Sequence, residues 1–529
     1  MPLPASGATW PPTDPAVQSD LADWDAWYSA EPDRLEQRYE GRGTLGTPNR
    51  PAQYAGGIRG RVARWWWGTP TPDGEKRTKL HIPLAGDIAR TSSGLLFSEP
   101  PKLISDHAGT QTRLDKLVEK GLHPTLLESG ELSAALGGAY YRVVWDEEVS
   151  DRPWIDTVAA DRAVPEFRYG KLVAVTFWTV LPDPDDPTGR RVFRHLEKHE
   201  KGRIYHGLYE GSATSLGAVR PLQDHPATEP LAALVDKDGG LNTGAPDHLT
   251  ASYMPNVRPA RSWRHIPSAA YWGQSDFQGI EGIMDALDEA WSSWMRDIRI
   301  GKGRIIVADT LLQSLGPGKG GTWNEDQEVY SGLNMLPRAG DPNPITDVQF
   351  AIRVTEHRDT CAALVEQAAQ QSGYSAATFG EADGTAVTAT EIRARQRRTL
   401  MTRAKKALYA DPALSSIVGA LLAVEAGDLF RVRDLDVTEP PKVEFEDSIS
   451  ESAGELATTA ELLRRGEAAS TDTLVRMMHP DWDDKQVKSE VDAILGESGR
   501  ATSDPTMTGA EGEGVPHAGL PSHGGGPRP

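Results

Sequence analysis

Cysteine is almost absent from this sequence: the 529 residues include only Cys361. A single cysteine excludes an internal disulfide and any zinc site built from cysteines. Long apolar runs are missing too. No stretch of about 18 consecutive apolar residues occurs, so we expect no membrane-spanning helix and no membrane partner. The first residues, Met1 to Ser6, have neither a basic start nor an apolar segment, which argues against secretion.

Positive charge is also in deficit, because 76 acidic residues outnumber 56 basic ones and the formal charge is −20. Non-specific affinity for nucleic acid comes from lysine and arginine that neutralise phosphates. The chain therefore does not coat DNA by its overall charge, and any contact with DNA must leave the DNA free to slide. With 25% charged and 38% apolar residues, the composition is that of a soluble globular protein of roughly two to four domains.

Enzyme signatures are missing from the sequence. It contains no G-x-S-x-G, no H-E-x-x-H, no Walker A motif and no G-x-G-x-x-G after a strand. The glycine-rich stretch 316–321 does not qualify as a phosphate loop, since Lys319 is not followed by serine or threonine. His357-Arg-Asp359 copies part of a kinase catalytic loop, but it lies inside a predicted helix without the partner motifs. We therefore predict a protein that is not an enzyme and needs no cofactor.

Metal ligands are equally sparse. His195 and His199 flank Glu197 at a spacing that would put all three on one face of a strand. No aspartate or third histidine lies nearby in the sequence to complete a ligand set. We interpret these residues as structural and predict no metal site.

The strongest periodic segment begins at Ser275, which we expect to cap a helix of about 25 residues, roughly 37 Å long. Acidic residues fill its first half and basic residues end it, which suits the helix dipole. Its apolar residues recur at alternating three- and four-residue steps, a heptad-like stripe that predicts packing against other helices. The stripe consists of Phe277, Ile280, Met284, Leu287, Trp291, Trp294 and Ile298.

A second helix is predicted from Val354 to about Gln371, with Gly373 as its stop. The stretch between these helices, Gly303–Arg353, has the short strands and turns of a small β tip. After a loop over Tyr374–Val387, a capping box of Thr388 and Glu391 starts a long basic helix. We expect a narrow apolar stripe along it, surrounded by seven basic residues between Arg393 and Lys406. The stripe consists of Ile392, Leu400, Ala404 and Leu408.

Other segments give simpler predictions. Three adjacent tryptophans, Trp65 to Trp67, cannot share one face of a regular element, so they lie either at a subunit or domain contact or in a local aromatic cluster. Before residue 263 we expect a helical segment over 16–39, a helix over 83–97, strands between 131 and 209 and a variable surface excursion over 211–262. Towards the C-terminus we expect a strand near 443, three short helices after it and a disordered tail from 497.

Three stretches, taken in order, resemble the portal (head-to-tail connector) proteins of tailed double-stranded DNA bacteriophages. His81–Glu99 is similar to the wing helix of that family, and Gly273–Asp288 to the start of its first stem helix. Gly373–Glu391 is similar to its tunnel loop and the beginning of the long helix that follows. The resemblance covers roughly residues 80–495. It implies an α+β portal fold with an α/β wing, a two-helix stem, a small β-containing clip, a tunnel loop with a long helix, and a helical crown.

The resemblance also implies boundaries along the chain. They are 1–272 for the N-terminal region and wing, 273–302 for stem helix 1, 303–352 for the clip, 353–373 for stem helix 2, 374–387 for the tunnel loop, 388–447 for the long wing helix and following strand, 448–498 for the crown, and 499–529 for the disordered tail.

The function implied is that of a ring of about twelve subunits at one capsid vertex, through which double-stranded DNA is packaged and ejected. The implied partners are further copies of the chain, DNA, terminase, head-completion or adaptor proteins, the major capsid protein and scaffolding protein. The implied location is the portal vertex of the virion, and the host cytoplasm during assembly. The alternatives are a capsid adaptor without a channel and, less favoured by the residues, a capsid-associated nuclease or protease.

Two groups of site residues follow from this resemblance. We expect the loop at the narrowest point of the channel to present Thr378, Phe379, Glu381, Asp383 and Thr385 to DNA. We expect contacts between subunits at Trp291, Trp294, Arg393, Arg397 and Arg398. In this interpretation the basic residues from Arg393 to Lys406 pair with acids of the neighbouring subunit, in preference to phosphate.

Overall fold

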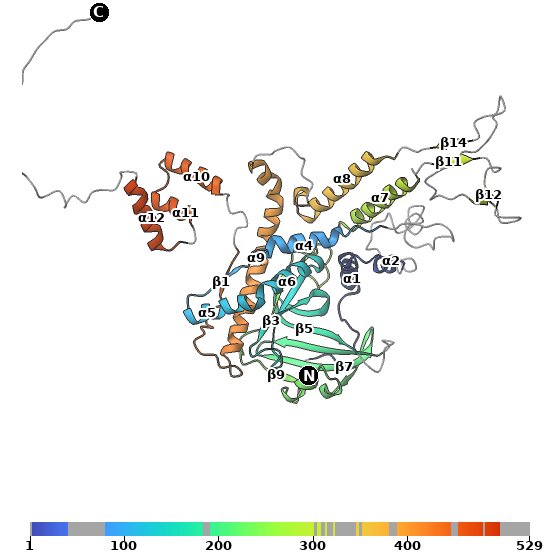
Figure 1. Cartoon of the computed structure of the whole chain (residues 1–529). Helices are drawn as coiled ribbons and strands as arrows, with labels where there is room; N and C mark the ends of the chain where they lie inside the picture. Colours follow the sequence, from blue (N-terminus) through green and yellow to red (C-terminus); the bar gives the residue numbers. More distant parts are fainter. Residues whose placement is uncertain are drawn as a thin grey trace, which may run out of the picture. The chain divides into compact units, whose positions relative to one another are not determined.

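The computed structural model describes residues 3–40, 80–182, 191–300, 304–307, 313–314, 321–322, 345–348, 352–379, 389–445, 453–479 and 482–497. The chain divides into two compact units, Met1–Glu446 and Asp447–Pro529. Helices and antiparallel sheets both contribute, so the α+β class is confirmed (Figure 1). The tryptophans at 65–67, the glycine-rich stretch 316–320, the cap Thr388 and the tail beyond Glu497 lie outside the described residues.

Two short helices form the beginning of the first unit. The predicted helical segment 16–39 is divided into α1 (Pro15–Ser29) and α2 (Pro32–Glu40), because Ala30 adopts a left-handed conformation with φ of 55°. Their apolar side is buried as expected, with Trp24 and Leu35 almost without exposed surface. The helix predicted over 83–97 is confirmed as α4 (Leu84–Phe97).

Two further helices were not predicted from the sequence. They are α5 (Ala108–Leu117) and α6 (His123–Leu136), which precede the strands. The predicted change to strands at residue 131 is therefore a few residues too early, because α6 continues to Leu136 and ends at Gly137 in a left-handed conformation.

A six-stranded antiparallel sheet and a three-stranded one follow. The larger sheet has the order β4-β5-β6-β7-β8, with β9 paired to β7, and the smaller has the order β10-β2-β3. The strands of the two sheets are β2 (Gly138–Val144), β3 (Trp154–Ala159), β4 (Ala163–Arg168), β5 (Lys171–Leu181), β6 (Val192–Glu200), β7 (Arg203–Ser212), β8 (Ser215–Arg220), β9 (Gly240–Asn242) and β10 (Ala251–Pro255). A separate pair joins β1 (Lys102–Ile104) to β15 (Lys442–Glu444).

The interpretation of residues 211–262 as a surface excursion is wrong for its last part. Strand β10 is largely buried, pairs with β2 along its full length and packs against a long helix of the same unit. The composition of the stretch, rich in glycine and proline, hides a five-residue strand whose side chains complete the core.

The histidines of β6 take part in a buried polar network, as a structural role requires. Glu197 accepts a hydrogen bond from Arg142 of β2 at 2.7 Å and lies 2.7 Å from Nε2 of His199. His195 stacks on His206 of β7, with ring nitrogens 3.2 Å apart. Within the described part of the chain, no group of three or more histidine, cysteine or acidic side chains is arranged to hold a metal ion.

The network predicts acid sensitivity. Burial lowers the pKa of His206 from 6.5 to about 4, so the folded protein holds it neutral while the unfolded chain protonates near pH 6.5. Stability is therefore complete above pH 6.5 and is lost as the pH falls toward 4; the share from His206 between pH 7.5 and 5 is roughly 2 kcal/mol. Between pH 7.5 and pH 5, urea denaturation should show a smaller loss of unfolding free energy for His206→Phe than for the wild type. An equal loss in both proteins would contradict this assignment.

Two antiparallel helices extend from the sheets, and together we name them the stem. The first is α7 (Glu281–Ile300) and the second is α8 (Val354–Ser372), capped by Gly373 with φ of 92°. Asp297 near the end of α7 contacts His357 near the start of α8 at 2.9 Å, which fixes the antiparallel direction. Between them, β11 (Arg304–Val307) pairs with β14 (Ile345–Val348) and β12 (Gln313–Ser314) with β13 (Gly321–Thr322), as the predicted β tip requires.

The first stem helix begins later than predicted. Ser275 does not cap it: its hydroxyl donates to the carbonyl oxygen of Ala135 at 2.6 Å and accepts from the amide of Phe277. Gly279 has a φ of 93°, which interrupts the helical backbone, and α7 starts at Glu281. The heptad-like stripe is nevertheless buried at its first four positions, down to Leu287, and becomes progressively exposed toward Ile298.

The long basic helix is α9 (Ala389–Ala426). Its predicted apolar stripe is wrong at Ala404 and Leu408, which point to solvent, while Leu400 is half-buried. The inner face instead carries Thr399, Lys406 and, from Ala410 onward, a continuous apolar run in the core.

One stretch of α9 has the composition of a membrane span. Residues Arg397–Ala426 are long and apolar enough to cross a membrane when only length and composition are considered, although no uninterrupted apolar run of this length occurs in the sequence. Of the most apolar window, 61% is buried inside the protein, and the core helices of soluble proteins pass the same test. The stretch is explained by its packing against β2, β3 and β10.

The second unit consists of α10 (Ala453–Arg465), α11 (Thr471–Met478) and α12 (Asp484–Glu497), as predicted. Ser470 caps α11 by accepting from the amide of Thr473. Asp483 and Gln486 form a reciprocal capping box at the start of α12. Among the described residues of this unit, Val475 and Val487 are the buried apolar side chains.

Candidate functional site: the junction of the stem, the loop and α9

A buried lysine lies where the stem joins the rest of the first unit. The Nζ atom of Lys406, on the inner face of α9, donates to Oδ2 of Asp276 at 2.6 Å and to Oγ of Ser92 in α4 at 2.6 Å. It also lies 2.9 Å from the hydroxyl of Tyr374, which itself donates to Asp276 at 2.8 Å. We call these four residues the junction cluster. They connect α4, the segment before α7, the segment after α8, and α9.

The junction cluster is almost completely withdrawn from water. The side chains of Lys406 and Asp276 are 4% and 5% exposed. Burial lowers the pKa of Lys406, and the adjacent carboxylate of Asp276 opposes that shift by favouring the charged ammonium. Burial also raises the pKa of Tyr374 well above its usual value, so its hydroxyl stays protonated and donates a hydrogen bond to Asp276. Each charged atom therefore has a partner, which is the condition for tolerating a buried ion pair.

Hydrogen bonds and a close backbone approach hold Asp276 of this cluster in place. The side-chain amide of Asn256 donates to Oδ1 of Asp276 at 2.7 Å, and the backbone amide of Asp276 donates to the carbonyl oxygen of Ala134. Gly273 lies so close to Gly137 that an added Cβ would meet the Gly137 oxygen at 2.1 Å. The segment before α7 is thus fixed against the end of α6 and the end of β10.

The first residues of the loop after α8 are also anchored. They form a short 3₁₀ turn, Ala376–Phe379, beneath α9. The hydroxyl of Thr378 lies 2.9 Å from that of Thr399 in α9, and the amide of Ser375 donates to the same oxygen. Phe379 packs against the main core with its ring edge-on to Tyr374, the centroids being 6.2 Å apart. Thr378 and Phe379 therefore belong to the base of the loop.

The other residues predicted for the loop, Glu381, Asp383 and Thr385, lie outside the described residues, so the orientation toward DNA stays a prediction for all five. Trp291 and Trp294 are half-buried on α7 and contact each other, with Trp294 also stacked on His357 of α8. Their predicted role between subunits stays a prediction.

The basic residues of α9 separate into two groups. Arg397 and Arg398 are exposed, while the side chain of Arg393 lies outside the described set, so their pairing with a neighbouring subunit stays a prediction. For Lys406 the expectation is wrong, because its partner Asp276 belongs to the same chain. Arg403 likewise donates to the carbonyl oxygen of Leu95 in α4. Helical spacing alone could not reveal this, since it does not say which side of α9 faces the core.

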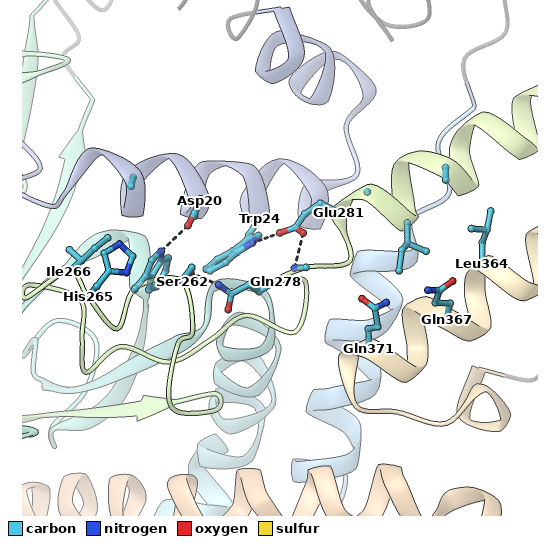
Figure 2. A pocket seen from close by; sticks show the side chains of 16 residues that line it. Asp20, Trp24, Ser262, His265, Ile266, Gln278, Glu281, Leu364, Gln367 and Gln371 are labelled. Atoms are coloured by element: carbon cyan, nitrogen blue, oxygen red, sulfur yellow. Dashed lines mark hydrogen bonds between the residues drawn. The ribbon is translucent and has the colours of Figure 1, made fainter. Parts of the chain in front are cut away.

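An open groove of about 770 Å³ lies beside the start of the stem (Figure 2). Among the described residues, its walls come from α1, the turn around Trp263, the segment leading into α7, the first turns of α7 and the C-terminal half of α8. Two carboxylates are fixed on it: Asp20 accepts from the Trp263 indole at 2.8 Å and Glu281 from the Trp24 indole at 3.1 Å. Gln367 and Gln371 of α8 form the facing wall.

The part of the chain that contains the stem, the loop, α9 and the C-terminal helices matches a known family. Residues 271–504 match the family model described as phage portal protein, SPP1 Gp6-like. No curated protein matches the chain significantly. The resemblance to phage portal proteins is thereby confirmed, and the family match supports a phage portal role for the chain. The family is structural rather than enzymatic, oligomeric, and associated with the capsid of the virion.

Asp276, Tyr374 and Ser92 were not selected from the sequence as site residues. All three lie within stretches used for the resemblance, yet nothing in their spacing signals a shared lysine. The one available sign is that the pair Lys405–Lys406 precedes the apolar stretch 417–424 of the same helix by about three turns, so one of the two charges can lie on the side that faces the core.

Proposed function

We propose that this chain is the subunit of a portal ring at one capsid vertex, the channel through which double-stranded DNA enters and leaves. The observation that carries the proposal is the match of residues 271–504 to the portal family, over elements that include an antiparallel two-helix stem. The clip strands between those helices are the docking site for terminase and then for head-completion or tail proteins. The major capsid and scaffolding proteins contact the ring during assembly in the host cytoplasm.

Electrostatics supports a channel that lets DNA slide. DNA carries about one phosphate charge per 1.7 Å of axis, and a basic wall would hold it through released counterions. This chain has a charge of −20, and the loop carries Glu381 and Asp383 in place of cations. We propose that these acids, with Thr378, Phe379 and Thr385, lie at the narrowest point of the channel.

The test combines assembly with DNA movement. Purified chain should form rings of about twelve subunits in negative-stain images. The variant Glu381→Lys/Asp383→Lys should form the same rings, yet package DNA at least about tenfold more slowly, because two lysines per subunit would bind phosphates. Packaging in a defined in vitro system is the measurement.

The matched control is Glu381→Gln/Asp383→Asn, which removes the acids without adding cations and should package DNA close to the wild-type rate. A wild-type chain that stays monomeric at micromolar concentration would refute the portal ring and favour an adaptor without a channel. If the lysine variant forms normal rings and packages DNA at the wild-type rate, the loop does not lie at the narrowest point of the channel. That outcome would leave the portal ring itself standing.

A further inference from the structure

The turn between β4 and β5 contains a tyrosine in a position that favours asparagine. Arg168 of β4 pairs with Lys171 of β5, so Tyr169 and Gly170 form a two-residue turn. Both have positive φ, 49° and 81°, as a type I′ turn requires. Asparagine and glycine adopt this conformation readily, whereas a bulky side chain with positive φ is strained. We call residues 168–171 the basic tip.

Packing inside the subunit does not compensate for this strain. The side chain of Tyr169 is 95% exposed. Beside the turn lies Tyr271, which is 39% exposed and would meet an added Cβ on Gly170 at 3.5 Å. Tyrosine is enriched in protein interfaces because it combines a large apolar ring with a polar group. A strained residue that the core does not use indicates a role outside the subunit.

The cations of the basic tip have no partner in the subunit. Arg168 and Lys171 are exposed, and among the described residues neither forms an ion pair. Other cations of the same sheet do form them, since Arg203 pairs with Asp236. The chain as a whole has a charge of −20. An occupant of the basic tip should therefore offer carboxylates together with apolar surface.

The loop between β2 and β3, residues 145–151, has this complementary chemistry. Its apolar surface comes from Val149, which is 71% exposed, and from Trp145, which is 37% exposed and edge-on to Phe430. We call residues 145–151 the acidic loop. Its four carboxylates are all exposed and belong to Asp146, Glu147, Glu148 and Asp151.

Two of these carboxylates are already engaged and two are not. Asp146 accepts a hydrogen bond from the amide of Glu148 at 2.9 Å, and Asp151 lies 3.8 Å from Lys120. The carboxylates of Glu147 and Glu148 have no ion pair or hydrogen bond among the described residues. The acidic loop thus offers two unpaired anions to match the two unpaired cations of the basic tip.

The basic tip and the acidic loop of one chain lie at opposite ends of β2. Tyr271 lies against Gly170, and two residues later Gly273 lies against Gly137, immediately before β2. The acidic loop begins directly after β2, which has seven residues and spans roughly 23 Å. This length exceeds the reach of an arginine or lysine side chain. The acidic loop of the same chain therefore leaves the basic tip unpaired, and a second copy offers the same loop without this restriction.

We propose that the basic tip of one subunit binds the acidic loop of a second copy of the chain. Tyr169 packs against Val149, and the two cations of the tip pair with Glu147 and Glu148. Because the two surfaces differ, the contact is head-to-tail, and repetition of a head-to-tail contact closes a ring when the rotation fits. The inference rests on the proposed portal function and adds to it surfaces that join neighbouring subunits.

The variant Tyr169→Asn separates the contact from the fold. Asparagine suits the type I′ turn better than tyrosine, so the melting temperature should equal or exceed that of the wild type. Loss of the ring of Tyr169 should nevertheless lower the fraction of chain in subunit rings at least about fivefold at a fixed concentration. Mass photometry is the measurement. A stable variant that assembles like the wild type would overturn the proposal.

Charge exchange on the full chain tests the pairing. Arg168→Glu/Lys171→Glu should lower the fraction of chain in rings at least about tenfold, because glutamates would face the acidic loop. Glu147→Lys/Glu148→Lys should weaken assembly in the same way, since lysines would face the basic tip. The four changes together should restore rings, because the opposite charges then meet again.

A cross-link identifies the two surfaces directly. Tyr169→Cys and Val149→Cys are prepared as separate chains and mixed, so that a disulfide between these positions can only join two molecules. Native Cys361 is buried and does not compete. The mixed sample should give a covalent dimer under mild oxidation, and neither variant alone should do so to the same extent.

The outcomes separate the interface from the function. Lys201→Glu/Lys237→Glu, an equal charge change at exposed lysines elsewhere in the unit, should assemble like the wild type. Wild-type rings with no effect of the tip reversal and no mixed cross-link would overturn the interface and leave the portal function standing. Intact rings that bind less DNA after the tip reversal would also overturn it and assign the basic tip to nucleic acid. A wild-type chain that forms no ring would overturn both.

Discussion

Replacing Lys406 with alanine should strongly destabilise the first unit. The substitution leaves Asp276 buried with its cation removed, and breaking one side of a buried ion pair costs roughly 3 to 5 kcal/mol. The same change removes the donor to Ser92 and a partner of Tyr374. We expect a clear fall in the urea midpoint of the first unit and a lower melting temperature in calorimetry.

A matched pair of controls isolates the buried charge. Lys405→Ala changes the adjacent exposed cation and should alter stability by no more than about 0.5 kcal/mol. Lys406→Met with Asp276→Asn removes both charges together and should recover much of the loss, because no buried charge is then left without its partner. If Lys406→Ala unfolds within about 1 kcal/mol of the wild type, the ion pair does not hold the junction.

The second large effect is expected for Gly137→Ala at the end of α6. Gly137 has a φ of 82°, and an added Cβ would lie 2.6 Å from the carbonyl oxygen of Gly273. The left-handed conformation costs a residue with a side chain about 1 to 2 kcal/mol, and forced overpacking adds about 1 to 3 kcal/mol. A total loss of roughly 2 to 5 kcal/mol should appear in equilibrium denaturation.

Gly94→Ala provides the comparison for this substitution. Gly94 lies in α4 with helical geometry, and an added Cβ would meet no atom within 4 Å. Alanine should therefore be neutral or stabilise the helix by up to about 1 kcal/mol. Equal effects at the two glycines would show that the close approach of residues 137 and 273 is not needed.

Both predictions concern the place where the family-matched part of the chain meets the N-terminal region. Gly273 lies at the start of the matched residues 271–504, and Asp276 follows it by three positions. Loss of packing at this point should change the angle at which the stem leaves the sheets. In the proposed ring, that angle would be repeated in every subunit, so small local changes would affect closure.

The sequence by itself determined the elements whose pattern is local. Helix α8 and its stop at Gly373 follow from apolar spacing and from a glycine that tolerates positive φ. Strands β2, β5 and β7 follow from runs of β-branched and aromatic residues. The three short C-terminal helices follow from their caps, and the resemblance to portal proteins was carried by short motifs in the correct order.

Tertiary structure decided the features that depend on which side of an element faces the core. Helix α9 is the clearest case: its spacing permits burial of Leu408 or of Lys406, and only the positions of Asp276, Tyr374 and Ser92 select the lysine. The start of α7 at Glu281 likewise depends on Ser275 binding the end of α6. Hydrogen bonds between residues distant in sequence outweigh local periodicity at such sites, because a buried charge must find its partner wherever the fold provides one.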